Sequence, residues 1–257
     1  MEFVLTKPQL QLLLAAMDSD RKPGHRGHPD CLKHIWVDGN RAITADTQMV
    51  AVVQLGEANA VDMPPMLIDG SAIRNLSKGV NHLTVTLDGG GYVRVKRQPD
   101  PLKRPSSAKI GILNPAAFPV WSIEDYLMRT PEAGKVSVAE LKEVLSRKEF
   151  NNDVIMKKRG YFHILFADSK GELLWRDAAS GKETKLLDMQ KTAKKYVDIY
   201  LNPFQLKSVL RPVGLWDRDG TIEIGIQNRN VARFEAPGVQ VLLSGFPYLD
   251  SIGIRIL

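Results

Sequence analysis

Alternation of apolar and polar residues predicts β-hairpins over most of the chain. In HIWVDGNRAITADTQMVAVVQL, residues 34–55, two alternating runs flank Asp38-Gly39-Asn40, and these residue types favour a tight turn. The pattern recurs in residues 82–97, 161–178 and 220–236, each time with Gly, Asn or Asp at the turn. It predicts a chain rich in antiparallel sheet.

Short segments with apolar residues spaced three and four apart predict helices between the hairpins. They cover residues 8–17, 71–79, 137–149 and 202–213. Residues that cap helix starts support them: Asp69 or Ser71 opens the second segment, Ser137 the third and Asn202 the fourth. Each helix follows a short apolar strand.

A unit of strand, helix and small meander therefore repeats along the chain at intervals of about 60 residues. One helix over a few strands buries too little apolar surface to be stable alone, so the units are expected to pair into domains. The predicted fold class is α+β, with domains at residues 1–120 and 136–257. Residues 121–135 are the predicted connector, because periodicity stops there and breaker residues cluster.

Composition indicates a soluble globular protein. The 257 residues are 44% hydrophobic, and no run approaches the roughly 18 apolar residues that a membrane helix needs. The N-terminal sequence lacks a signal-peptide pattern, and one cysteine cannot form an internal disulfide, so a cytoplasmic location is expected. The net charge of +6 is modest and dispersed, which suits a folded face that touches phosphates.

The candidate for metal chemistry is a cluster at three-residue spacing: His25, His28, Cys31 and His34. Imidazole and thiolate are common ligands of zinc. However, a strand is expected to begin near Cys31, and residues three apart on a strand point to opposite faces. No metal and no cofactor are therefore predicted. Nucleotide-loop, calcium-loop and catalytic motifs are also missing from the sequence, so no enzymatic activity is expected.

Several local stretches resemble the DNA sliding clamps, in particular the bacterial DNA polymerase III beta clamp. MEFVLTKPQLQLLLAAM is similar to its opening strand and helix, DGNRAITADTQMVAVV to its second hairpin, and SSAKIGILNPAAFPVW to the end of a clamp domain. The layout matches over nearly the full chain, whereas the specific stretches lie in the first domain. The resemblance implies a DNA clamp fold, with a pseudo-twofold pair of units in each domain, antiparallel sheets outside and helices lining a ring.

The function that this resemblance implies is that of a processivity factor that encircles duplex DNA and tethers a replicative polymerase. Beta clamps have three domains and close as dimers, whereas two-domain clamps such as proliferating cell nuclear antigen and phage clamps close as trimers. A homotrimer, phage or plasmid encoded, is therefore expected, with polymerase and clamp loader bound through short peptide motifs. Two alternatives remain: a basic processivity subunit that works as a monomer or dimer without a ring, and a metal-dependent regulator or enzyme built on the His/Cys cluster.

Phosphate contact needs Lys or Arg on the helix faces opposite the apolar ones. The second, third and fourth helices carry such residues. For any single pair of cations on one helix, the simpler alternative to DNA binding is an ordinary solvated helix face. A glycine-punctuated basic loop after the first helix is expected to face the duplex as well. The predicted DNA-binding residues are Arg21, Lys22, Arg26, Arg74, Lys78, Lys142, Arg147, Lys148, Lys207 and Arg211.

The resemblance also implies an apolar surface that captures partner peptides. Its members come from the second hairpin of the first domain, the connector and the C-terminal residues. They are Thr44, Asp46, Gln48, Met49, Phe118, Pro119, Trp121, Ile254, Ile256 and Leu257. The alternative for the apolar members is a place in the core.

Overall fold

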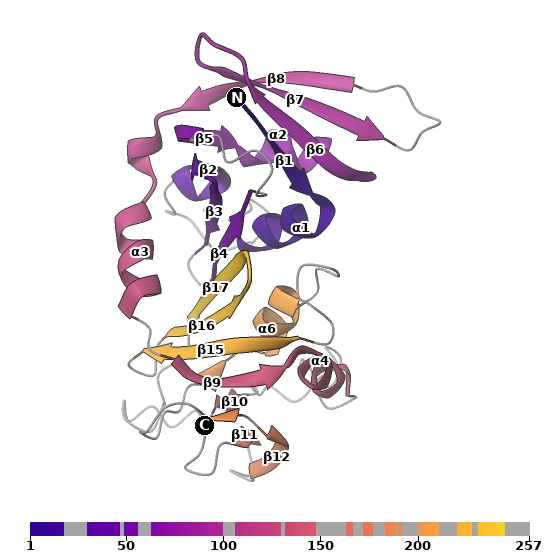
Figure 1. Cartoon of the computed structure of the whole chain (residues 1–257), viewed down its shortest axis with the longest axis vertical. Coiled ribbons are helices and arrows are strands. Elements are labelled where there is room, and N and C mark those ends of the chain that lie inside the picture. The colour runs from indigo at the N-terminus through magenta and orange to yellow at the C-terminus, as the bar shows by residue number, and fades with distance from the viewer. Residues whose placement is uncertain are drawn as a thin grey trace, which may run out of the picture. The chain divides into compact units, whose positions relative to one another are not determined.

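The computed structural model describes the chain in fourteen ranges. These are residues 1–17, 30–46, 49–55, 63–99, 106–129, 132–147, 163–166, 172–176, 183–188, 190–191, 200–201, 203–210, 220–227 and 231–244. The chain divides into two compact units, Met1–Ile123 and Glu124–Leu257 (Figure 1). This division falls inside the segment predicted to be the connector.

Unit 1 contains two copies of the predicted strand, helix and meander. The first copy is β1 (Glu2–Thr6), α1 (Lys7–Ala16), β2 (His34–Gly39), β3 (Arg41–Ala45) and β4 (Met49–Gln54). The second copy is β5 (Met63–Asp69), α2 (Gly70–Leu76), β6 (Val80–Leu87), β7 (Tyr92–Pro99) and β8 (Ser106–Leu113). The predicted turn between β2 and β3 is present, and Gly39 has the positive φ of 55° that such a turn requires.

The two copies exchange their first strands. β1 pairs with β6 of the second meander, and β5 pairs with β2 of the first, both antiparallel. The strand order is therefore β1-β6-β7-β8-β5-β2-β3-β4. Because each copy completes the sheet of the other, neither copy has a finished core by itself.

Unit 2 repeats this arrangement. Its first copy is β9 (Glu132–Ser137), α4 (Val138–Ser146), β10 (His163–Phe166), β11 (Glu172–Arg176) and β12 (Glu183–Asp188). After the short β13 (Gln190–Lys191), the second copy is β14 (Tyr200–Leu201), α6 (Pro203–Leu210), β15 (Thr221–Gln227), β16 (Val231–Ala236) and β17 (Val239–Ser244). Again β9 pairs with β15 and β14 with β10, so the predicted α+β clamp architecture is confirmed.

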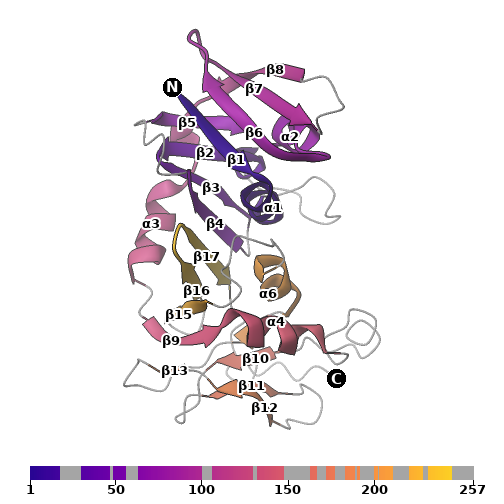
Figure 2. The ribbon, with the colours of Figure 1, turned by 45° about the vertical axis from the view of Figure 1, so that its right-hand side comes forward.

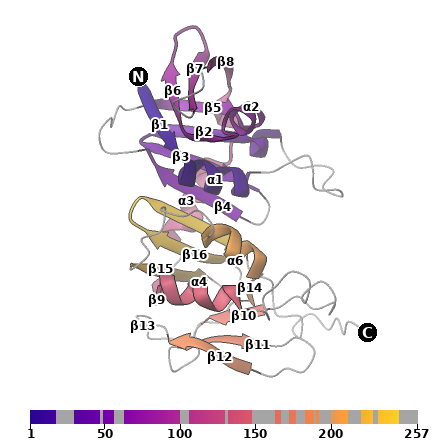
Figure 3. The ribbon, with the colours of Figure 1, turned by 90° about the vertical axis from the view of Figure 1, so that its right-hand side faces the viewer.

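The core of unit 1 lies between its sheet and its helices. Phe3 and Leu5 on β1 are buried, as are Leu12 and Leu13 on α1, while Val4 is 39% exposed on the other side of β1. α1 packs against β1, β3, β4 and β6, and α2 packs against β2 and β5. Figure 3 shows unit 1 with α1 on the near side of its strands. The sheet thus has one face toward the helices and one face away from them.

A helix that the sequence pattern did not predict, α3 (Val120–Arg129), leads from unit 1 into unit 2. Its buried side chains, Ile123 and Leu127, are four residues apart. Trp121 and Met128 are 81% and 79% exposed, and these outward apolar residues hide the helical period in the sequence. None of the helices in the described ranges is long and apolar enough to span a membrane.

Candidate nucleic-acid interface

Helix α2 is fixed at its first turn by hydrogen bonds and close packing. The Asp69 carboxylate accepts hydrogen bonds of 2.8 Å from both the amide and the hydroxyl of Ser71, which confirms Asp69 as the predicted cap. Burial raises the pKa of Asp69, but the hydrogen bonds from Ser71, the amide of Ala72 and the nearby His34 outweigh it, so the pKa lies below its ordinary value. A Cβ on the buried Gly70 would lie 2.4 Å from the carbonyl oxygen of Lys33.

Three cationic residues lie on or near the other end of α2. Arg74 donates from Nη2 to the carbonyl oxygen of Leu14 on α1 at 3.4 Å. Lys78 is exposed, and its Nζ lies 3.3 Å from Oδ1 of Asn75. Arg97 on β7 donates from its guanidinium to the backbone carbonyl of Lys78. Arg74, Lys78 and Arg97 are called the α2 cluster below.

The sequence reasoning missed Arg97, although a signal was available. Val93 and Val95 are fully buried, and side chains two apart on a strand share a face. Arg97 also pairs in register with the buried Leu83 on β6. Position 97 therefore lies on the helix side of the sheet, where a long cationic side chain can reach the end of α2.

In unit 2 the predicted cations lie on α4 and α6, which contact each other. α4 begins at the predicted cap, since the Glu140 amide donates to Oγ of Ser137 at 3.3 Å. Lys142 is half-buried on this helix, and Arg147 is exposed at its end. Lys207 on α6 is half-buried beside Leu206, and this burial lowers its pKa. The negative charge of an approaching phosphate would raise the pKa of Lys207.

The remaining predicted DNA-binding residues lie outside the described ranges. They are Arg21, Lys22, Arg26, Lys148 and Arg211.

Several residues predicted to form a peptide-binding surface are packed inside unit 1. Thr44 is fully buried, and its hydroxyl donates to the carbonyl oxygen of Leu13 at 2.8 Å, which ties β3 to α1. Met49 is 5% exposed, and its amide donates to the Asp46 carboxylate at 2.7 Å. Phe118 is 3% exposed and stacks on Trp36, with ring centroids 6.3 Å apart. In this structure these three side chains are part of the packed interior of unit 1.

Other members of the predicted surface are open to solvent. Pro119 is exposed, and Trp121 at the start of α3 presents most of its indole. Met128 lies seven residues further on, hence two turns along the same helix face. Gln48, Ile254, Ile256 and Leu257 lie outside the described ranges.

Comparison with solved structures gives matches over nearly the whole chain. A DNA polymerase III beta subunit from Eubacterium rectale covers 96% of this chain at a TM-score of 0.67 and 13% identity, and the match spans 66% of that protein. Sliding clamps from Pseudomonas aeruginosa and Bacillus subtilis match 99% and 100% of the chain, with TM-scores of 0.66 and 0.65 and identities of 15% and 13%. The chain has the DNA sliding-clamp fold.

The match to these clamps rests on structure alone. No protein-family model matches the sequence, and no curated protein does. The chain spans about two thirds of the length of the clamps it matches, which are covered to 66% and 68%. Identities near 13% mean that the positions of functional residues have to be argued from this clamp-fold chain itself.

The His/Cys cluster contributes no metal site within the described part of this clamp fold. No group of three or more potential ligands comes together there, and His25 and His28 lie outside it. The prediction of a strand beginning near Cys31 is wrong, because Asp30–Lys33 form one 3-10 turn and β2 starts at His34. Pro29 and Asp30 favour such a turn. Nδ1 of His34 lies 3.8 Å from the Asp69 carboxylate.

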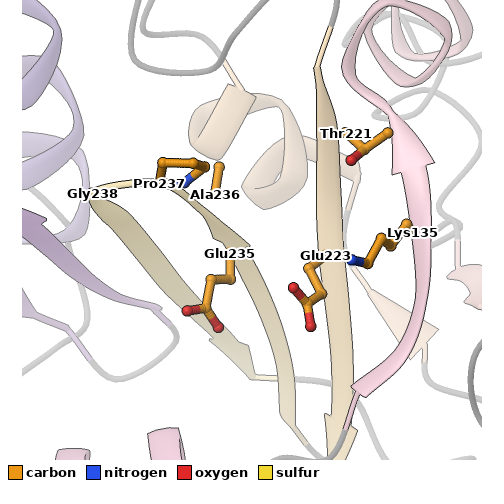
Figure 4. Close-up of a pocket in the computed structure, with 7 residues that line it drawn as sticks. All are labelled: Lys135, Thr221, Glu223, Glu235, Ala236, Pro237 and Gly238. Carbon is orange, nitrogen blue, oxygen red and sulfur yellow. The ribbon is translucent and has the colours of Figure 1, made fainter.

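A pocket of about 340 Å³ in unit 2 is lined by charged side chains of adjacent strands (Figure 4). Glu223 pairs in register with Glu235 on one side and Lys135 on the other. Like charges in register repel, but Gln240 donates to Glu235 at 2.8 Å and Arg233 lies 3.3 Å from it. The remaining lining residues are Thr221, Ala236, Pro237 and Gly238. Neighbouring polar and cationic groups therefore offset the negative charges of the two glutamates, and the pocket is interpreted as part of the polar surface of the sheet.

Proposed function

We propose that the chain is a DNA polymerase sliding clamp, a processivity factor that encircles duplex DNA and tethers a replicative polymerase to its template. The observation that carries the proposal is the clamp fold over 96% to 100% of the chain. The exchange of first strands in both units supports it, because each unit then joins two strand-helix-meander copies and carries two helices packed on its strands. Predicted DNA-binding Lys or Arg residues occur on three of these helices, α2, α4 and α6.

A clamp performs no covalent chemistry, so its residues need only bind phosphates without reading sequence. In unit 1 we assign this role to the α2 cluster, and in unit 2 to Lys142, Arg147 and Lys207. Arg21, Lys22, Arg26, Lys148 and Arg211 are proposed to join them. Several weak contacts hold the duplex while still permitting sliding, because each phosphate contact is exchanged easily with counterions.

The proposed assembly is a homotrimer. Three copies of a chain with two units supply six units, which is the number expected of a closed clamp ring. A mass of about three times 28.6 kDa by light scattering at micromolar concentration is the expected result. A stable monomer or dimer that still supports a polymerase would instead favour the basic, non-ring processivity subunit.

The proposed partners of the ring are a DNA polymerase and a clamp loader that carry short peptide motifs. The exposed Trp121 is the best placed member of the predicted peptide-binding surface, because large aromatic side chains dominate such contacts. We further propose that the protein acts in a bacterial cytoplasm and is phage or plasmid encoded.

Retention on closed circular duplex during gel filtration tests the function. Lys78→Ala with Arg147→Ala removes two exposed cations, one from each unit, and no buried contact of their side chains is lost. We expect the double variant to fold as the parent does and to leave the circle faster. Unchanged retention would overturn the assignment of these side chains to phosphate contact.

A further inference from the structure

The face of the unit 1 sheet that points away from α1 carries its own cluster of cations. Along β7, the buried residues Val93 and Val95 alternate with the exposed residues Tyr92, Arg94 and Lys96. The next strand adds Ser107 and Lys109, which pair in register with Lys96 and Arg94. Figure 2 shows β1, β6, β7 and β8 side by side. The residues Tyr92, Arg94, Lys96, Ser107 and Lys109 are called the β7–β8 face.

The charges of the β7–β8 face are only partly neutralised. Arg94 forms an ion pair with Asp88 at 2.9 Å. Lys96 and Lys109 are exposed, and neither forms an ion pair with another residue in the ranges that the structure describes. The carboxylate of Glu2, on the far strand of this sheet, accepts a hydrogen bond of 2.8 Å from Thr86. The face is therefore a cationic surface with two lysines available.

An exposed aromatic ring adjoins these lysines. Tyr92 is 43% exposed, and Nζ of Lys109 lies 4.5 Å from the centre of its ring. The residue opposite Tyr92 on β8 is Gly111, where an added Cβ would meet nothing within 4 Å. Open space thus lies over Gly111, on the same side of the sheet as the lysines.

We propose that the β7–β8 face binds a single strand of nucleic acid, with a base stacked on Tyr92 and phosphates on Lys96 and Lys109. Lys109 lies opposite Arg94, so it is the diagonal neighbour of Lys96 across the β7–β8 pair. Such neighbours are about 7–8 Å apart, which suits successive phosphates of an extended chain. Aromatic stacking combined with cations is the usual way in which proteins hold single strands without reading their sequence. This site differs from the helix-borne cations assigned to duplex DNA, and it does not depend on ring closure.

An acidic peptide is the competing occupant, since carboxylates would also bind the lysines. Carboxylates do not stack on an exposed aromatic ring, whereas a base does. Apart from Tyr92, the residues of the β7–β8 face are polar or charged, so the face offers an apolar peptide side chain little to pack against. The observations therefore favour the nucleotide chain.

The test is the binding of the full chain to a fluorescent oligothymidylate of about 12 nucleotides, followed by anisotropy over a range of salt concentrations. Such a short linear strand cannot be retained by a ring. Lys96→Glu with Lys109→Glu is expected to weaken binding at least tenfold. Lys96→Gln with Lys109→Gln should reduce the slope of log affinity against log salt by about 1.4, since each phosphate contact on a single strand contributes about 0.7.

Two uncharged substitutions test the stacking. Tyr92→Ala is expected to weaken binding by about tenfold with an unchanged salt slope, while Tyr92→Phe retains it. Gly111→Val adds bulk at the position opposite Tyr92 on β8 and is expected to weaken binding similarly without changing any charge. The matched control is Lys7→Glu, an exposed lysine at the start of α1, which should leave the affinity within twofold.

Circular dichroism shows whether each variant folds. If the glutamate double variant does not fold, the glutamine double variant provides the test instead. If either double variant of Lys96 and Lys109 bound the single strand with the parent's affinity, the proposal would be overturned. Insensitivity to Tyr92→Ala and Gly111→Val together would also overturn it, because that result would leave an acidic peptide as the better occupant. If Lys96→Glu with Lys109→Glu weakened binding of a duplex of the same length as much as binding of the single strand, the single-strand assignment would be overturned. Retention on circular duplex, measured separately, should not change in the β7–β8 face variants.

Discussion

The two faces of the unit 1 sheet differ in how they use their polar residues. On the helix side, Arg74 and Arg97 are exposed only in part and donate to backbone carbonyls of α1 and of Lys78. On the β7–β8 face, Lys96 and Lys109 are open to solvent. The difference shows that one strand can serve both surfaces, because Arg97 points to one side and its neighbour Lys96 to the other. Substitutions on the helix side should therefore affect stability, and those on the β7–β8 face should affect binding alone.

The largest difference in stability between the two sides of the sheet is expected from glycine substitutions. Gly70→Ala puts a Cβ 2.4 Å from the carbonyl oxygen of Lys33, and the backbone has to shift to relieve the overlap. We expect the free energy of unfolding in urea to fall by about 2–3 kcal/mol. Gly111→Ala is the matched control and should change it by less than about 0.5 kcal/mol, because the added methyl group meets nothing within 4 Å. Equal effects would mean that the two faces do not differ in packing.

A smaller difference in stability is expected between threonine substitutions on the two sides of the sheet. Thr44→Val removes the hydroxyl that donates to Leu13 and leaves a buried carbonyl without this partner, which should cost about 1–2 kcal/mol of unfolding free energy. Thr84→Val, on the outer side of β6, should cost less than about 0.5 kcal/mol. Denaturant titration of both variants measures this. A neutral Thr44→Val would show that the hydrogen bond does not anchor α1 to β3.

Neighbouring cations of β7 give the most direct comparison. Arg97→Met loses the hydrogen bond to the carbonyl of Lys78 and should cost about 1 kcal/mol while also shortening retention on circular duplex. Lys96→Met should leave the free energy of unfolding unchanged and weaken oligothymidylate binding. The assignment of faces would be reversed if Lys96→Met shortened retention on duplex and Arg97→Met weakened oligothymidylate binding.

The smallest effect is expected from the pH dependence of the α2 cap. Because the pKa of Asp69 in the folded chain lies below its ordinary value of 3.8, the ionised carboxylate contributes stability above pH 3.8. That contribution is lost as the pH falls through the lower, folded value. The difference in unfolding free energy between the parent and Asp69→Asn should therefore be constant above about pH 5 and shift toward the Asn variant below 3.8. A difference that stays constant down to about pH 2 would contradict this.

The sequence predicted the repeated units well because their signals are local. Alternation identified the hairpins, and capping residues such as Asp69 and Ser137 marked the starts of helices. The exchange of β1 and β5 between the two halves of unit 1 was not predictable in this way. A strand's own residues do not specify which distant strand it pairs with, and the clamp resemblance was used only to expect a pseudo-twofold pair of units.

The site residues were predicted less completely, for related reasons. Periodicity alone does not say which face of a strand meets a helix, and for that reason Arg97 was overlooked. Thr44 was placed in the peptide-binding surface by the clamp resemblance, not by the strand pattern. Helix α3 was missed because its exposed Trp121 interrupts the apolar pattern. Placing the cations of β7 required the strand register, which joins Arg97 to the buried Leu83 and Lys96 to Ser107.

Retention of the protein on a circular duplex before and after a single cut tests the proposed function most directly. A ring that encircles DNA should stay on the closed circle through gel filtration and be lost from the linear product, because the ends allow it to slide off. The β7–β8 face variants should show the same dependence on the cut. Retention that does not depend on linearisation would mean that the protein holds duplex by its charges alone, and it would contradict encirclement.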